Sequence, residues 1–134
     1  MLSEVVIPIN IEPHFAERIL VERYVAPVEP ETDMAAAVQA INDFYQQVQR
    51  EFFVIVDARQ FPVTFDVLVD ALDLVRRHIA GVPVRFVVIG DGELVRLAAE
   101  AIAQKQYGGF EAGKVFATDS EALEYCTAEL RKSA

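Results

Sequence analysis

The chain has 134 residues, 53% of them hydrophobic, a length that fits one domain over residues 1–134 with a core that needs no disulfide or metal. Its formal net charge is −9, from 21 acidic and 12 basic side chains, so its surface repels phosphate backbones and nucleic-acid binding is not expected. No stretch approaches the roughly 18 uninterrupted apolar residues that a membrane helix needs, which argues against a membrane span.

Two strands are predicted near the N-terminus. Residues 5–11 alternate imperfectly between aliphatic and other side chains, and Pro8 suits an edge strand, where a missing N–H does no harm. Residues 18–26 form a second strand candidate. The short connection through residues 13–16 favours antiparallel pairing of the two.

A helix and a buried strand are predicted next. The helix covers about residues 32–50, with Thr32 as its cap and apolar side chains recurring at helical spacing. The strand is Phe52–Asp57, a continuous run of aromatic and β-branched residues that ends in an acid. A run of this kind is typical of a central strand that is buried on both faces.

Three more helices and two more strands follow in alternation. Thr64 can cap the second helix, the strand of residues 84–90 comes next, and Asp91 can cap the third helix. The last strand, residues 114–117, leads into a final helix, where Thr118 and Glu121 have the spacing of a capping box. The final helix is expected to bury the following residues: Ala122, Leu123, Cys126 and Leu130.

The repeated order of strand and helix predicts an α/β fold. The expected order is strand, strand, and then helix and strand in alternation up to a final helix, with about four helices in all. The sheet is expected to be mixed, with parallel central strands and helices covering its faces.

The second helix is more apolar than one core face requires. Its expected core stripe consists of Leu68, Ala71, Leu72, Val75 and Ile79. The additional apolar residues are Phe65, Val67, Val69 and Leu74. Exposed apolar area of this kind often marks an interface, and cover by neighbouring loops is an equally weighted alternative.

Acidic residues follow three of the predicted parallel strands. Asp57, Asp91 and Asp119 would meet at the carboxyl edge of the sheet, where α/β proteins place binding sites, and together they could hold Mg²⁺. Asp91 and Asp119 also lie at helix starts, where an acid stabilises unpaired amides and the helix dipole. We favour this structural interpretation and expect no metal site.

No catalytic constellation is evident. Cys126 falls on the apolar face of a helix, and nothing brings His14 or His78 to a nucleophile and a third orienting group. The single cysteine cannot form an internal disulfide, and the start of the chain, MLSE, lacks the features of a signal peptide. We therefore expect a cytoplasmic protein that is not an enzyme and carries no cofactor.

Three segments resemble the STAS fold of bacterial anti-sigma-factor antagonists, the SpoIIAA-like proteins. They are residues 53–57, residues 84–89 and residues 115–123, and the last, VFATDSEAL, is similar to the Phe…Glu-Ala-Leu ending of these domains. The resemblance extends from about Arg18 to Leu130. It implies a single STAS-type α/β domain with a regulatory, protein-binding role.

The phosphorylation motif of the antagonists is missing. In that family an Asp-Ser-Ser/Thr-Gly turn opens the helix after the central strand, and a partner kinase phosphorylates its serine. The equivalent stretch here is residues 63–67, where Asp66 lies near the place of the serine and no glycine follows. Thr64 is better explained as a helix cap. The resemblance therefore implies a divergent member that docks without being phosphorylated.

Two functions follow from these observations. The first is docking to a second copy or to a protein partner, and the alternative is carrying or sensing a small apolar ligand, with Phe61 and Phe65 at the pocket rim. The candidate interface or pocket residues are Asp57, Phe61, Thr64, Phe65, Asp66, Val67, Val69 and Leu74.

Overall fold

The computed structural model describes residues 8–25, 27–60, 65–79, 81–90, 93, 96–97, 100 and 114–132. The strands are β1 (Ile9–His14), β2 (Ile19–Tyr24), β3 (Phe52–Asp57), β4 (Val84–Ile89) and β5 (Lys114–Phe116). They form one sheet in the order β1-β2-β3-β4-β5, in which β1 is antiparallel to β2 and the other neighbours are parallel. The predicted mixed sheet and its antiparallel first pair are confirmed.

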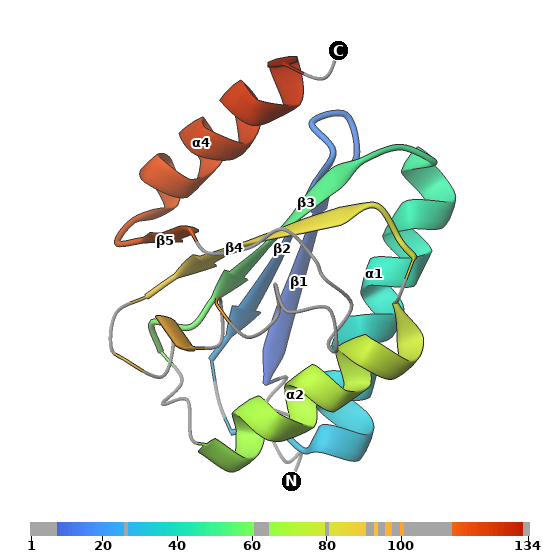
Figure 1. Ribbon diagram of the computed structural model, residues 1–134, viewed down its shortest axis with the longest axis vertical. Helices are drawn as coiled ribbons and strands as arrows, with labels where there is room; N and C mark the ends of the chain where they lie inside the picture. Colours follow the sequence, from blue (N-terminus) through green and yellow to red (C-terminus); the bar gives the residue numbers. More distant parts are fainter. Residues whose placement is uncertain are drawn as a thin grey trace, which may run out of the picture.

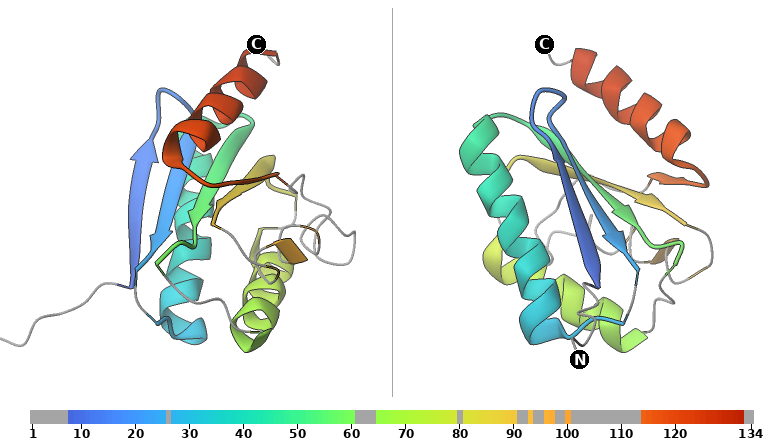
Figure 2. Two further views of the ribbon diagram at one scale, coloured as in Figure 1. Left: turned by 90° about the vertical axis from the view of Figure 1, so that its left-hand side faces the viewer. Right: turned by 180° about the vertical axis from the view of Figure 1, so that it is seen from behind.

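The helices cover the two faces of the sheet unequally. They are the π-helical turn η1 (Pro30–Met34), α1 (Ala35–Val48), α2 (Phe65–His78) and α4 (Asp119–Lys132). Figures 1 and 2 show α1 and α2 on one side of the sheet and α4 on the other. Right-handed crossovers that step in one direction across a sheet place their helices on the same face, which explains the position of α1 and α2.

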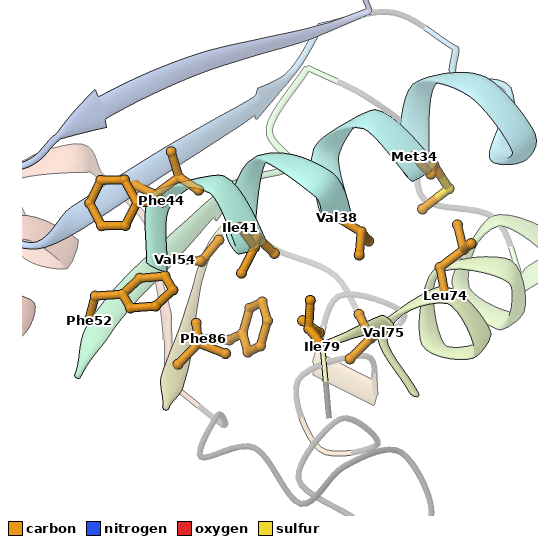
Figure 3. Packing of buried hydrophobic residues seen from close by; sticks show 12 residues of the cluster. Met34, Val38, Ile41, Phe44, Phe52, Val54, Leu74, Val75, Ile79 and Phe86 are labelled. Atoms are coloured by element: carbon orange, nitrogen blue, oxygen red, sulfur yellow. The ribbon is translucent and has the colours of Figure 1, made fainter. Parts of the chain in front are cut away.

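Alternation along the strands feeds two hydrophobic cores. In β3, Phe52 and Val54 pack toward α1 and α2 with Phe86 of β4, and this larger core appears in Figure 3. Phe53 and Ile55 point the other way and pack with Cys126 and other residues beneath α4. Burial on both faces is the reason that β3 is a continuous hydrophobic run.

Prolines shape the open edge of the sheet at β1. The Val25 N–H, just after β2, donates to the Pro8 carbonyl at 2.8 Å, so the backbone polar groups of Pro8 face β2. Pro8 has no N–H to donate back to Val25, and β1 therefore begins only at Ile9. Positions that face β2 and positions that face away from it alternate along β1. By the same alternation, the nitrogen of Pro13 points away from β2. The missing donor at Pro13 makes this edge a poorer template for an additional strand. The predicted strand at residues 5–11 is thus shifted, and its residues 5–7 lie outside the described residues.

The first helix starts and ends differently from the prediction. Thr32 is not its cap, because residues 30–34 form the π-helical turn, in which Asp33 Oδ2 accepts a hydrogen bond from the Glu29 N–H at 2.8 Å. The helix ends at Val48, before the predicted residue 50. There Gln49 adopts a left-handed conformation with φ of 53° and donates its N–H to Tyr45 O.

The prediction that Leu74 adds exposed apolar surface to the second helix is wrong. Leu74 is 7% exposed and belongs to the larger core, where it points toward Met34 (Figure 3). The buried arc of α2 is wide because this helix packs against η1 and α1. Val69, by contrast, leaves 47% of its surface exposed.

The final helix has the predicted cap but a different buried face. Thr118 Oγ1 accepts from the Glu121 N–H at 3.3 Å and donates its hydroxyl to Glu121 Oε1 at 3.0 Å. Ala122, Cys126 and Leu130 are buried as expected, whereas the expected burial of Leu123 is wrong, because it is 38% exposed. The helix packs mainly on β3, β4 and β5.

The third predicted helix lies mostly outside the described residues. Within the predicted segment, residues 93, 96–97 and 100 are helical. Apart from these residues, the described helices are η1, α1, α2 and α4, and the remaining one of the four or so expected helices is this segment.

The contrast between Leu74 and Val69 gives a stability test. Leu74→Ala should lower the free energy of unfolding by about 2–4 kcal/mol, because it leaves a cavity in the larger core. Val69→Ala should change the same quantity by less than about 0.5 kcal/mol, since the side chain is half exposed. Urea unfolding of the two variants measures the difference, and similar losses would contradict the position of α2.

Candidate functional site

An ionic cluster joins four elements at the carboxyl edge of the sheet. Asp57 ends β3, and Arg23 lies opposite it on β2 in the parallel register. Arg59 follows β3 by two residues, and Asp119 is the first residue of α4. Glu12 of β1 completes the set through its ion pair with Arg23. We call these five residues the arginine–aspartate cluster.

Asp57 is the centre of the cluster. Its side chain accepts from Arg59 Nε at 3.0 Å and Nη2 at 2.9 Å, and from Arg23 Nη1 at 2.8 Å. The Arg59 backbone N–H adds a further bond at 3.1 Å. Both guanidinium groups also reach Asp119 Oδ1, at 3.1 Å from Arg23 and 2.8 Å from Arg59. The cluster thus links β2, the connection after β3, and the start of α4.

The charges of the cluster stabilise one another. Hydrogen bonds from the Arg59 side chain, followed by its backbone N–H and the Arg23 side chain, lower the pKa of Asp57 to about 2 against the opposing effect of burial. Hydrogen bonds to Asp119 and Glu12 raise the pKa of Arg23. Asp57 therefore stays ionised at neutral pH although it is only 3% exposed.

The carboxylates that could have held Mg²⁺ are engaged with arginines. Asp57 and Asp119 share two guanidinium groups, and Asp91, the third acid of that hypothesis, lies outside the described residues. Across the described ranges, no group of three or more His, Cys, Asp or Glu is arranged to hold a metal ion. The observed geometry is that of an anchor between elements.

The other predicted site residues do not gather around Asp57. Val69 lies exposed on α2, and Leu74 lies in the larger core. Phe61 and Thr64 are outside the described residues. Phe65, Asp66 and Val67 fall in the first turn of α2, where the structure describes no side chains.

Sequence reasoning missed both arginines of the cluster. Arg23 lies in a predicted strand whose alternation would have placed it on a face with Val21 and Ile19. Arg59 comes two residues after an acid at a strand end, a spacing that allows a side chain to fold back on it. The available signal was an acid closing a buried strand, which requires a cationic partner nearby.

A second missed feature is a buried acid on the opposite face of β2. Glu22 is 2% exposed, and its Oε2 has no hydrogen-bond partner among the residues that the structure describes. Burial raises the pKa of Glu22 to about 8, so the carboxyl is largely protonated at neutral pH. Burial, and then the charge of Glu22, raise the pKa of Tyr24 on the same face.

A groove opens on the α4 side of the sheet, and we call it the α4 groove. Its cavity volume is about 390 Å³. Its floor consists of the following strand residues: Ile19, Val21, Ile55 and Ile89. Leu123 and Thr127 of α4 form one wall, and Glu12 and His14 of β1 form the other. The groove thus lies between α4 and β1, above floor residues that are themselves buried.

The fold has a solved counterpart. No known family model matches the chain, and none of the curated proteins is detectably similar to it. A crystal structure of an uncharacterized protein from the DUF3478 family of Shewanella loihica PV-4, described as having a SpoIIAA-like fold, superposes with a TM-score of 0.62. The match is 22% identical and covers 94% of this chain and 98% of the other. The likeness confirms the expected SpoIIAA-like fold.

No helix among the described residues is long and apolar enough to cross a bilayer.

Stability should depend on pH through Glu22. In the folded state Glu22 keeps a proton that it loses above its ordinary pKa of 4.5 in the unfolded state. The contribution of Glu22 to the free energy of unfolding is therefore full below pH 4.5 and is lost as pH rises through about 8. Glu22→Gln should remove this loss and stabilise the protein at pH 8 by a few kcal/mol relative to wild type. Urea unfolding at several values between pH 5 and pH 8 measures the free energy of unfolding as a function of pH. An equal pH dependence in both proteins would contradict the raised pKa of Glu22.

Removing the charge of Asp57 should be strongly destabilising. Asp57→Asn removes the buried carboxylate that the two arginines share in addition to Asp119, and it should lower the free energy of unfolding by about 3 kcal/mol at pH 7. Because the pKa of Asp57 is lowered to about 2, the contribution of Asp57 to the free energy of unfolding is full above its ordinary pKa of 3.8. This contribution is lost as pH falls through about 2.

The matched control for Asp57 is Asp73 on α2. Asp73 also pairs with two arginines, Arg76 at 2.7 Å and Arg77 at 3.0 Å, but its side chain is 44% exposed. Asp73→Asn should therefore lower the free energy of unfolding far less than Asp57→Asn does. Chemical denaturation of both variants at pH 7 gives the comparison, and a small loss in Asp57→Asn would show that the cluster is not an anchor.

Proposed function

We propose that the chain is a non-enzymatic regulatory domain that binds a protein, either a second copy or a different partner, through the exposed face of α2. The observation that carries the proposal is the exposure of Val69, 47%, on the helix that follows the central strand. The resemblance to anti-sigma-factor antagonists supports it, because that family regulates by docking.

The surroundings of Val69 suit an interface. Val69, Asp73 and Arg76 are spaced at i, i+4 and i+7 on α2, so they share one helix face. Arg77 also reaches Asp73 and widens the charged border. An apolar centre with a charged rim is the usual composition of a binding surface.

The remaining candidate residues join this proposal on sequence grounds. Phe61, Thr64, Phe65, Asp66 and Val67 directly precede Val69 in the chain. The docking that we propose needs no phosphorylation, because residues 63–67 lack the Asp-Ser-Ser/Thr-Gly motif. A fixed aspartate is a weak substitute for a phosphate, since it has less charge and fewer acceptor oxygens.

We also place this domain in the cytoplasm. Support comes from Cys126, a buried free thiol whose pKa burial raises to about 12. A thiol of this kind is unreactive and is compatible with a reducing compartment.

The docking proposal predicts different outcomes for two equally exposed residues. Val69→Glu should abolish association, because it puts a charge at the centre of the proposed contact. Leu97→Glu is the control, since Leu97 is also 47% exposed but lies outside α2. Light scattering coupled to size exclusion measures self-association over a range of concentrations.

For a different partner, the same positions can carry a photo-crosslinking amino acid in cells. An adduct of defined mass at position 69 and none at position 97 would support the proposal. A wild-type protein that is monomeric at every concentration and forms no adduct at position 69 would contradict it.

The alternative function is that of a carrier or sensor of a small apolar ligand. The observation that favours it is the α4 groove, whose volume of about 390 Å³ lies in the range of small-molecule sites. This groove lies on the face of the sheet opposite α2, and not at the pocket rim expected from Phe61 and Phe65. The ligand titration below tests this alternative.

A further inference from the structure

The α4 groove combines an apolar floor with an acidic rim. The floor residues are aliphatic and β-branched, and each is at most 3% exposed. A ligand can therefore touch only a small part of each floor side chain. Leu123 offers more contact, because 38% of its surface is exposed along the wall. The partly exposed side chain of Leu123 and the edges of the floor residues together offer apolar contact for a short alkyl chain.

The charges around the groove favour a cation. Its charged lining residues are Glu12, Glu17, Asp119 and Arg23. The guanidinium of Arg23 pairs with Glu12 and Asp119 and so offsets part of this negative charge, which leaves Glu17 as the open carboxylate of the rim. Glu17 makes no ion pair within the described part of the chain. An anion would be repelled by this rim, while a cation would gain an open carboxylate partner.

We propose that the α4 groove binds a small aliphatic amine. The alkyl chain lies along Leu123 and the floor, and the ammonium group pairs with Glu17 at the rim. This inference rests on the second of the two functions above, that of a small-ligand carrier or sensor. It is independent of docking through α2.

Three probes with six-carbon chains separate the contributions. Hexylammonium, 1-hexanol and hexanoate share the alkyl chain and differ in charge. Titrations of the full chain at pH 7.5 and low salt, followed in ¹H–¹⁵N spectra, report both affinity and location. Hexylammonium should shift the amides of Val21, Leu123 and Thr127 and bind about tenfold more tightly than hexanoate. Added salt should weaken its binding.

Paired variants test each half of the site. Glu17→Gln should weaken hexylammonium several-fold and leave 1-hexanol unchanged. Its control is Glu124→Gln, which removes the same charge from an exposed position of α4 that does not line the groove. Leu123→Ala should weaken both probes, whereas Leu97→Ala should weaken neither.

The outcomes distinguish a preference for amines from the existence of any ligand site in the α4 groove. Equal binding of the three probes in the groove would overturn the amine and leave the carrier function standing. No shift in the groove with any probe would overturn both. If Glu124→Gln weakens hexylammonium as much as Glu17→Gln, the cation is attracted by the net acidic chain alone and the proposed site is wrong. None of these results affects the test at Val69.

Discussion

The buried carboxylate of Asp57 is the constraint on which the arrangement of this domain depends. An ionised acid that is 3% exposed is tolerable only where cations pair with it and donate to its oxygens. Arg23 comes from the neighbouring strand, and Arg59 comes from the connection that leaves β3. Both also hold Asp119, so the start of α4 is tied to the carboxyl edge of the sheet. Hydrophobic burial alone would hold the helix against the sheet without fixing this end.

The helices cover the two faces of the sheet unequally, and each of the two proposed binding sites lies on a different face. On one face, α1 and α2 enclose the larger core, and the outer side of α2 carries Val69. On the other face, α4 packs over β3 to β5, and the α4 groove lies between α4 and β1 with floor residues from β2, β3 and β4. A protein bound at Val69 and a ligand bound beside Leu123 would therefore occupy opposite sides of the sheet. Docking and ligand binding do not exclude each other sterically.

Sequence reasoning succeeded where a signal was local and failed where burial depends on distant elements. The run Phe52–Asp57 predicted a central strand, because burial on both faces requires apolar residues at every position. Leu74 was misjudged because its burial depends on η1 and α1 packing against α2. Leu123 was misjudged for the opposite reason, since periodicity cannot show which part of the apolar face of α4 the sheet covers. The pairing of Arg23 with Asp119 joins residues 96 positions apart, and no local pattern predicts it.

The groove and the cluster share residues, and this limits how the groove can be studied. Glu12, Arg23 and Asp119 line the groove and also belong to the arginine–aspartate cluster. A substitution at any of the three would change the rim charge and at the same time remove support from Asp57 or from the start of α4. A loss of ligand binding in such a variant would not separate a direct contact from a displaced helix. Glu17 and Leu123 lie outside the cluster, so their effects on a ligand can be attributed to the groove itself.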